Sequence, residues 1–472
     1  MTDKTWRMGF HLMPPSGWIN DPNGLCQFRG VYHAFFQYSP DWPNGGERCW
    51  GHATSTNLVS WDYHDVAIHQ DTPEDANGAY SGSTFVERGA AADGGDRMRI
   101  YYTGNVKHPG DYDYINEGRG ANEITVTSDD GMHFSPKQVL LRNADYPAYC
   151  SCHVRDPKLW EQRGELHMAL GARDRDSHGL ALIYSSTDGI DWRLRTAIRP
   201  TDDFGFMWEC PDVIRLVEGA DGQRHEFLGF CPQGMPAKDD DGRGTSWAGY
   251  LPLSGTAIDA TTADPALWRE WDGGFDFYAP QTFVDDAGRT LLIAWVGMPD
   301  EDFMGQPEQL DWIHSLSVPR TLEVDPKDPT RIMQWPVGEV DALRQEATEA
   351  QDGQLSLPCH RADIEVEGVQ GDFALTLDGA LAISGSGDSV TLSLDAATGC
   401  GRGARSIACG GIESLRVLVD ESIVEVFVNG GRATFTTRWF PTADKLDVRL
   451  EGSCASARAW TMAKAGTDPY EG

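Results

Sequence analysis

Three short segments of the sequence combine a carboxylate with a proline and with aromatic, amide or basic neighbours. They are Trp18–Gly24, in which Asp21 precedes a proline, Arg155–Pro157, and Trp208–Asp212, which contains Glu209. Proline fixes its own φ angle, so the backbone beside each carboxylate is restrained. A restrained carboxylate can serve as a nucleophile or a proton donor, although surface turns and structural ion pairs produce the same patterns.

The three carboxylates differ in their local chemistry. Arg155 beside Asp156 favours the ionised carboxylate, because a neighbouring cation stabilises the negative charge. The apolar and aromatic neighbours of Glu209 favour the protonated form that a general acid requires. Glycoside hydrolysis uses such a pair, with one carboxylate as nucleophile and one carboxylic acid as proton donor. Because these residues and Asp21 are far apart in the chain, the fold has to bring them together.

The elements around these segments are predicted to be strands. Short runs rich in β-branched and aromatic residues are bounded by Gly, Pro, Asn and Asp, and long helical periodicity is nearly absent. The clearest runs are Val31–Phe36, Met98–Tyr102, Ala181–Tyr184 and Thr290–Trp295. We therefore expect an all-β protein.

A short repeat indicates how the strands are grouped. The segments Ser55–Trp61, Ser128–Phe134 and Ser186–Trp192 each begin with serine, continue through an acidic or amide turn and end on an aromatic residue. Each copy follows a predicted strand, and a four-stranded unit of about 40–60 residues is typical of a β-propeller blade. The inner strands of a propeller meet around one axis, which would let distant carboxylates share a pocket.

The pattern changes about two thirds of the way along the chain. We predict a propeller domain over residues 1–325, a polar, proline-containing linker over 326–350 and a β-sandwich over 351–472. In the last segment the alternating run Ser414–Val428 precedes Asn429-Gly430, a pair suited to a tight hairpin turn. This segment lacks a concentrated set of catalytic residue types, so we expect it to be structural.

The composition excludes several classes of function. Among the 472 residues, 39 are Lys or Arg and 72 are Asp or Glu, which gives a formal net charge of −33. A surface this acidic repels nucleic-acid backbones and anionic lipid headgroups. No stretch approaches the roughly 20 apolar residues of a membrane helix. We therefore expect neither nucleic acid nor a membrane as a partner.

The cysteines and the first residues of the sequence indicate in which cellular compartment we expect the protein. The ten cysteines are scattered without CxxC pairs, and Met1–Arg7 lacks the apolar core of a secretory signal. Free thiols in the reducing cytoplasm are therefore a better interpretation than disulfides or a structural zinc site. We expect no metal ion.

Longer stretches around the motifs resemble glycoside hydrolase family 32, the β-fructofuranosidases. The matching segments, in family order, are Trp18–Gly24 (W-I-N-D-P-N-G), Phe36–Tyr38, Trp50–Ala53, Tyr80–Ser83, Arg155–Pro157, Glu209–Pro211, Asp276–Ala279 and Ala294-Trp295. The run Val424–Asn429 also resembles the family's sandwich domain. The resemblance implies a five-bladed β-propeller followed by a C-terminal β-sandwich, with no metal and no organic cofactor.

The resemblance also implies roles for individual residues. In a retaining double displacement, Asp21 matches the nucleophile, Glu209 the acid/base, and Asp156 the residue that steadies the transition state by holding fructose hydroxyls. Other residues match the fructose pocket or carry an aromatic ring suited to a sugar face: Asn20, Gln37, Trp50, Tyr80, Ser81, Arg155, Tyr278 and Trp295. The expected substrate is a small carbohydrate, sucrose or a short fructooligosaccharide.

Three alternatives stay open at the level of sequence. A sucrose-6-phosphate hydrolase or a fructosyltransferase would use the same covalent intermediate, and a non-catalytic sugar-binding propeller would use the same fold. Phosphate recognition needs Arg or Lys at the pocket rim, for which the candidates are Arg173 and Arg175, Lys107 and His108, and Arg119. Each candidate lies near carboxylates in the sequence, which predicts competition for the guanidinium groups. We therefore expect a higher kcat/KM on sucrose and kestose than on sucrose 6-phosphate, and little action on long inulin. Gly45 replaces the tryptophan usual in the family, which predicts an open rim.

Overall fold

The computed structural model describes residues 6–42, 44, 46–218, 222–238, 244–299, 306 and 310–465. Gly45, on which the expectation of an open rim rests, lies outside the described residues. Strands dominate the described residues, as predicted for an all-β protein, and the short 3-10 helices are η1 (Asn143–Asp145), η2 (Pro265–Leu267) and η4 (Gly338–Leu343). No helix within these ranges is long and apolar enough to cross a membrane.

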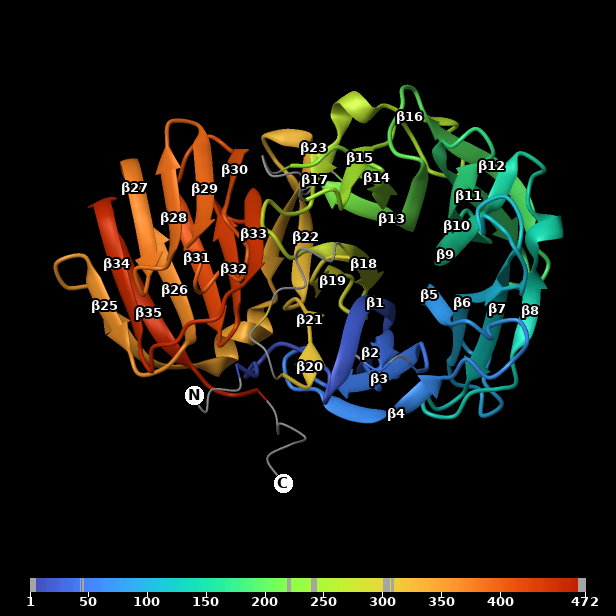
Figure 1. The fold of residues 1–472 in the computed structure, drawn as a ribbon, viewed down its shortest axis with the longest axis horizontal. Helices are drawn as coiled ribbons and strands as arrows, with labels where there is room; N and C mark the ends of the chain where they lie inside the picture. The colour runs from blue at the N-terminus through green and yellow to red at the C-terminus, as the bar shows by residue number, and fades with distance from the viewer. Residues whose placement is uncertain are drawn as a thin grey trace.

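The N-terminal part forms five separate sheets that stand around a common centre, on the right of Figure 1. The first sheet contains, in spatial order, β20 (Trp312–Ile313), β1 (Gly17–Phe28), β2 (Val31–Ser39), β3 (Cys49–Ser55) and β4 (Asp62–Ile68). The second contains β5 (Ala79–Glu87), β6 (Arg97–Lys107), β7 (Arg119–Ser128) and β8 (Gln138–Leu141).

The remaining three sheets of this part follow in chain order. The third contains β16 (Thr262–Ala263), β12 (Arg193–Pro200), β11 (Gly179–Ser186), β10 (Glu165–Asp174) and β9 (Cys150–Gln162). The fourth contains β13 (Met207–Glu218), β14 (Gln223–Gln233), β15 (Gly249–Pro252) and β17 (Arg269–Glu270). The fifth contains β18 (Tyr278–Val284), β19 (Thr290–Val296), β22 (Arg320–Asp325), β23 (Asp328–Pro336) and β21 (Ser315–Leu316), which pairs with β19.

The first strand of each sheet in chain order lies on the inside. These strands, β1, β5, β9, β13 and β18, contact one another in that order, and β18 closes the circle against β1. The pairing of β20 with β1 and of β21 with β19 joins the beginning and the end of this part, because the two strands are separated only by His314. The inner strands are therefore the elements that surround the centre.

The repeated serine turn occupies the same position in three sheets, between the third and fourth strands. Ser55, Ser128 and Ser186 each donate a hydrogen bond from Oγ to the side chain two residues later, over 3.1, 3.0 and 3.0 Å. That Asn or Asp side chain then accepts backbone N–H groups of the following turn. The sequence repeat is thus a structural repeat, since the same side chains close the same turn each time.

The C-terminal part consists of two six-stranded sheets, seen on the left of Figure 1. One contains, in spatial order, β24 (Arg344–Glu349), β35 (Ser456–Met462), β26 (Arg361–Glu367), β31 (Ser414–Asp420), β32 (Ile423–Val428) and β33 (Ala433–Arg438). The other contains β25 (Gln354–Leu357), β34 (Leu446–Ser453), β27 (Gln370–Leu377), β28 (Leu381–Ser386), β29 (Ser389–Leu394) and β30 (Ala404–Ala408). Asn429 and Gly430 have φ angles of 52° and 68°, which confirms the predicted hairpin turn.

Residues 326–350, expected to be a linker, carry regular structure. β23 pairs with β22 in the fifth sheet, and β24 pairs with β35 in the C-terminal part. Only η4 and its flanking residues lie between these two strands. Both strands lie at the edges of their sheets, and the side chains of β24 are exposed or half-buried, which accounts for the polar composition at that end of the segment.

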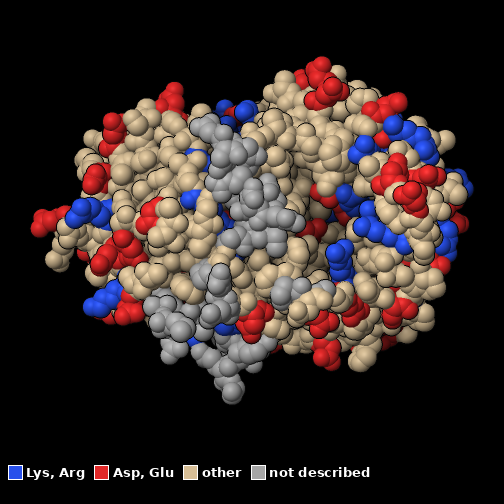
Figure 2. All heavy atoms as spheres, in the orientation of Figure 1, with Lys and Arg blue, Asp and Glu red and all other residues tan. Residues whose placement is uncertain are grey.

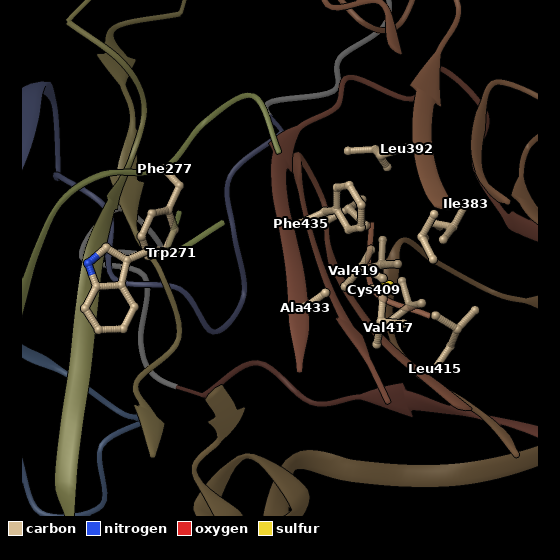
Figure 3. Packing of buried hydrophobic residues seen from close by; sticks show 14 of the residues in the cluster. Trp271, Phe277, Ile383, Leu392, Cys409, Leu415, Val417, Val419, Ala433 and Phe435 are labelled. Atoms are coloured by element: carbon tan, nitrogen blue, oxygen red, sulfur yellow. The ribbon is translucent and has the colours of Figure 1, made fainter. Parts of the chain in front are cut away.

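A continuous apolar core joins the two parts. Figure 3 shows Trp271 and Phe277 of the N-terminal part on one side of this core and Phe435 of β33 on the other. At the same interface the buried guanidinium of Arg320 donates to Glu425 over 2.5 Å. This packing holds β18 and β19 against the C-terminal part, so the C-terminal part supports one wall of the central pocket.

Candidate active site

Each of the five inner strands contains a β-bulge at the same level. Two residues of the inner strand stand opposite one residue of the next strand between Ile19 and Pro22, Ala79 and Gly82, Arg155 and Lys158, Glu209 and Asp212, and Tyr278 and Gln281. A bulge bends its strand and redirects the side chains next to it. The predicted catalytic residues and most of the predicted binding residues lie in these bulges or directly before them.

Proline explains why the sequence motifs mark the bulges. Asp156, Cys210 and Ala279 are the first bulged residues of their strands, and each has a positive φ angle (64°, 47° and 45°) followed by proline. Side chains other than glycine rarely adopt this conformation, and proline lacks the N–H group that a regular ladder would use. The motifs R-D-P and E-C-P are therefore the sequence signature of a strained turn in the strand.

A pocket of about 450 Å³ opens at the level of the bulges. Ten of the predicted site residues line it: Asn20, Asp21, Gln37, Tyr80, Ser81, Arg155, Asp156, Glu209, Tyr278 and Trp295. Trp50 does not line it. The Trp50 side chain is fully buried, and its indole N–H donates to the carbonyl of Tyr80 over 3.0 Å. The expectation that Trp50 stacks on sugar is therefore corrected, because this ring holds Tyr80 in place from behind.

Asp21 has the environment of a carboxylate held for attack. Its Oδ2 accepts a hydrogen bond from the Ser81 hydroxyl over 2.5 Å and a weaker one from the Cys210 thiol over 3.5 Å. Burial, and secondarily the charge of Glu209, raise the pKa of Asp21 to about 6, while the hydrogen bonds from Ser81 and Cys210 lower it. The carboxylate is therefore ionised at neutral pH and has few stabilising partners.

Glu209 has different partners from Asp21. Arg155 donates from Nη2 to Glu209 Oε1 over 2.6 Å, and the Tyr278 hydroxyl donates to Oε2 over 2.8 Å. The ring of the neighbouring Trp208 stacks on Phe230 and does not line the pocket, where Tyr278 and Trp295 are the aromatic residues on the side of Glu209. Two directional donors therefore fix the Glu209 carboxylate at the pocket wall.

Asp156 connects the pocket to its walls. Its Oδ2 accepts the backbone N–H of Cys210 over 2.9 Å, and its own N–H donates to Thr103 Oγ1 over 3.0 Å. Arg155 Nε lies 3.7 Å from the same carboxylate. Burial raises the pKa of Asp156 to about 7, against the effect of Arg155, which lowers it. Asp156 thus holds the bulge next to Glu209 and also lines the pocket.

Several pocket residues were missed by the sequence reasoning, among them Ser39, Arg48, His153, Cys210, Gln233 and Pro299. His153 was missed because a lone histidine carries little signal. Its Nε2 faces the Tyr114 carbonyl over 3.0 Å, and burial together with Arg155 lowers its pKa to about 3, so the ring is neutral. Cys210 lay within a quoted motif, and its role as a donor to Asp21 emerges only in three dimensions.

The rim of the pocket is cationic on one side. Figure 2 shows Lys and Arg side chains gathered beside a hollow in this face, where Figure 1 places β6, β7 and β9. Arg119 lines the pocket, and its guanidinium donates to the Tyr114 carbonyl over 3.0 Å and to Asn105 Oδ1 over 2.8 Å. Among the described residues, no carboxylate forms an ion pair with Arg119 or with the exposed Arg48 across the pocket.

The carboxylates expected to compete for Arg119 and Arg173 form no ion pair with either guanidinium group among the described residues. Asp113 instead caps its own loop by accepting the N–H groups of Ile115 and Asn116. Arg173 donates to Ser177 and stacks 4.8 Å from the Phe206 ring centroid, outside the pocket. Proximity in sequence misled the prediction because turn carboxylates satisfy the backbone of their own turn first.

Comparison with known proteins agrees with this geometry. The model of the glycosyl hydrolases family 32 N-terminal domain matches residues 11–336, and that of the family 32 C-terminal domain matches residues 386–462. The chain belongs to glycosyl hydrolase family 32. It is therefore a glycosidase, and the family predicted from the motifs is confirmed.

Individual relatives cover almost the whole chain. A sucrose-6-phosphate hydrolase from Bacillus subtilis is 33% identical over 97% of this chain and 94% of its own length. A raffinose invertase from Escherichia coli is 34% identical over 94% of this chain and 92% of its own. Among solved structures, a sucrose-6-phosphate hydrolase from Lactobacillus gasseri has a TM-score of 0.84 at 27% identity, covering 98% of this chain and 94% of its own.

Proposed function

We propose that this family 32 enzyme is a retaining β-fructofuranosidase that releases terminal β-D-fructofuranosyl residues from sucrose and short fructooligosaccharides. The observation that carries the proposal is the pair of carboxylates with opposite partners in one pocket. The side chains that donate to Asp21 among the described residues are a hydroxyl and a thiol, which leaves it free to attack, whereas Glu209 is fixed by Arg155 and Tyr278. A nucleophile and a directed proton donor are what retention requires.

The proposed reaction has two steps. Asp21 attacks the anomeric carbon of the fructosyl unit while Glu209 protonates the departing oxygen, which forms a covalent ester. Glu209 then removes a proton from water, which attacks the same carbon and releases Asp21. Asp156 accepts hydrogen bonds from fructose hydroxyls and so stabilises the positive charge that develops on the ring.

The two aspartates of the pocket respond to the charge of Glu209. Asp21, Asp156 and Glu209 line one pocket together with Arg155, and the charge of Glu209 raises the pKa of both aspartates. The protonation of either aspartate therefore depends on the charge of its neighbour. We propose that substrate displaces the Arg155 contact from Glu209, which leaves the Glu209 carboxyl group free to serve the departing oxygen.

The architecture proposed for this enzyme is a five-bladed propeller followed by a β-sandwich. The closed circle of inner strands and the five equivalent bulges support one blade per sheet. The position of β23 and β24 supports a domain boundary at η4 rather than a linker over 326–350. The proposed location is the cytoplasm, since the ten cysteines are free thiols, as a reducing compartment requires.

A second candidate function, hydrolysis of sucrose 6-phosphate, is favoured by the cationic rim. Arg48 and Arg119 line the pocket without a carboxylate partner among the described residues, although the chain carries a net charge of −33. Two guanidinium groups at the mouth would bind a phosphate on the glucose unit. The relatives named as sucrose-6-phosphate hydrolases also support this second candidate function.

One substrate panel separates the two candidates. Initial rates are measured on sucrose, sucrose 6-phosphate, kestose, inulin and levan, with chromatography of the products. A fructosidase must release fructose from at least one of them, and release from none would overturn the proposal. If the phosphate is recognised, Arg119→Gln and Arg48→Gln reduce kcat/KM on sucrose 6-phosphate about 10- to 100-fold and leave sucrose within about threefold. Equal losses on both substrates would exclude a phosphate subsite.

A further inference from the structure

The five sheets of the N-terminal part are joined near the bulges by a closed series of hydrogen bonds. In each link a backbone N–H group at or after a bulge donates to a side chain of the neighbouring sheet. The links are Gly82 to Asn23 (3.3 Å), Asp156 to Thr103 (3.0 Å), Cys210 to Asp156 (2.9 Å), Thr282 to Asp212 (2.7 Å) and Leu25 to Gln281 (3.2 Å). The bulges free these N–H groups from their own ladders, so the catalytic level depends on side chains for its geometry.

Gln281 makes two of the contacts that hold the nucleophile's surroundings. Its Oε1 accepts the N–H of Leu25 on β1, and its Nε2 donates to the carbonyl of Gly82 on β5 over 2.8 Å. The side chain lines a small cavity on the axis directly below the pocket, together with Ser81 and Gly82. Gln281 therefore connects three inner strands, β18, β1 and β5.

The contact between Asp21 and Ser81 depends on this connection. Asp21 belongs to β1 and Ser81 to β5, and the 2.5 Å hydrogen bond between them joins two separate sheets. Gly82 follows Ser81 directly, and side chains from β1 and β18 hold both its N–H and its carbonyl. A side chain at Gly82 would collide with Tyr101, because a Cβ there would lie 2.0 Å from the Tyr101 carbonyl oxygen. Gly82 therefore packs closely against the backbone of β6, and the side chains of Asn23 and Gln281 fix its N–H and carbonyl groups.

We propose that Gln281 is a positioning residue for the reaction: by fastening β5 to β1 and β18 it sets the Ser81 hydroxyl on the attacking carboxylate of Asp21. The inference rests on the proposed role of Asp21 as nucleophile. Gln281 contacts neither Asp21 nor Ser81 among its hydrogen-bond partners, so its effect passes through the backbone of Gly82 and Leu25. Without the Gln281 contacts, β5 could move relative to β1, and this movement would lengthen the hydrogen bond between Ser81 and Asp21.

The pH dependence of kcat/KM is sensitive to the hydrogen bond between Ser81 and Asp21. Asp21 faces Ser81 from β5, Glu209 and Cys210 from β13, and Arg155 and Asp156 from β9. The hydrogen bond from Ser81 opposes burial and the charge of Glu209, both of which raise the pKa of Asp21. If the Ser81 contact lengthens, the pKa of Asp21 rises further, and the acid limb of kcat/KM moves to higher pH.

The test compares Gln281→Met with Gln162→Met, using sucrose as substrate. Gln162 is a matched control, because its amide also makes two side-chain hydrogen bonds, with Glu226 (2.7 Å) and Trp160 (2.9 Å), and it stands at the far end of β9. Gln281→Met is expected to lower kcat about 10- to 100-fold with KM changed less than about threefold, and to move the acid limb upward. Gln162→Met is expected to lower the thermal midpoint and leave the pH profile unchanged.

Two further measurements decide the remaining outcomes. If Gln281→Met does not fold, Gln281→Glu keeps an acceptor for Leu25, loses the donor to Gly82, and is expected to move the acid limb in the same direction. An unchanged acid limb and kcat in either folded variant would overturn the inference. Asp21→Asn is measured alongside: full activity in that variant would refute the proposed function, whereas an inactive Asp21→Asn with a normal Gln281→Met would refute only the role of Gln281.

Discussion

Replacing Asp21 by asparagine is expected to inactivate the enzyme and also to stabilise it at neutral pH. The amide has nearly the same shape and keeps an oxygen that accepts from Ser81, but it cannot attack the anomeric carbon. A loss of several orders of magnitude in kcat is therefore expected. The gain in stability follows from the burial of the charge that asparagine lacks.

The magnitude of the stability gain follows from the pKa of Asp21. Burial raises it from 3.8 to about 6, so the folded state holds a proton that the unfolded state has released between these values. The free energy of unfolding of the parent thus falls as pH rises through this window and stays lower above it. Each pH unit corresponds to about 1.36 kcal/mol, which gives about 3 kcal/mol as an upper bound, since water in the pocket screens part of the charge.

Thermal unfolding of both proteins between pH 4 and pH 8 measures this difference. Asp21→Asn is expected to unfold at higher temperature than the parent at pH 7 to 8 and at nearly the same temperature at pH 4. A variant that is equally stable or less stable at pH 8 would show that the carboxylate is better solvated or better paired than its contacts indicate. Activity within tenfold of the parent would refute the role of Asp21 as nucleophile.

Two further perturbations test other parts of the account. Glu209→Ala is expected to lose most activity on sucrose, retain part of it on a fructoside with a good leaving group, and recover turnover with azide, which attacks without a general base; equal losses without rescue would exclude Glu209 as acid/base. The buried His11 has its pKa raised to about 9, because hydrogen bonds from its ring to Asp420 and Glu425 outweigh burial, which lowers it. The stabilisation by the charge of His11 is fully present below pH 6.5 and is lost as pH rises through 9. The free energy of unfolding of the parent should therefore fall by up to about 3 kcal/mol over this range. His11→Gln should show a much smaller loss in denaturant titrations, and an equal loss would contradict the assignment.

The sequence predicts the site well because its motifs describe backbone geometry as much as chemistry. Asp156 and Cys210 precede prolines and adopt positive φ angles, so the residues that mark the bulges are also those that carry or hold the carboxylates. The serine turns were predictable for a similar reason, since Ser and Asx side chains close a local turn by themselves. Features that depend on a few neighbouring residues, such as these bulges and turns, can be predicted from a short segment of sequence.

Features that depend on long-range packing were not predictable from sequence. The position of Trp50 behind Tyr80 depends on how the first and second sheets meet, and the partners of Glu209 come from β9 and β18. Arg119 was assigned to nearby carboxylates, whereas its donors face a carbonyl and an amide. The role of Gln281 depends on three strands meeting at one axis, for which a single glutamine gives no sequence signal.

The most direct test of the central claim is the identification of the residue that becomes fructosylated. Glu209→Ala is mixed with a fructoside that has a good leaving group, the reaction is quenched in acid within its burst phase, and the peptides are analysed by mass spectrometry. The account predicts one added hexosyl unit on the peptide that contains Trp18–Gly24, with fragmentation placing it on Asp21. An adduct on another carboxylate, or a burst of leaving group with no adduct on any peptide, would contradict it.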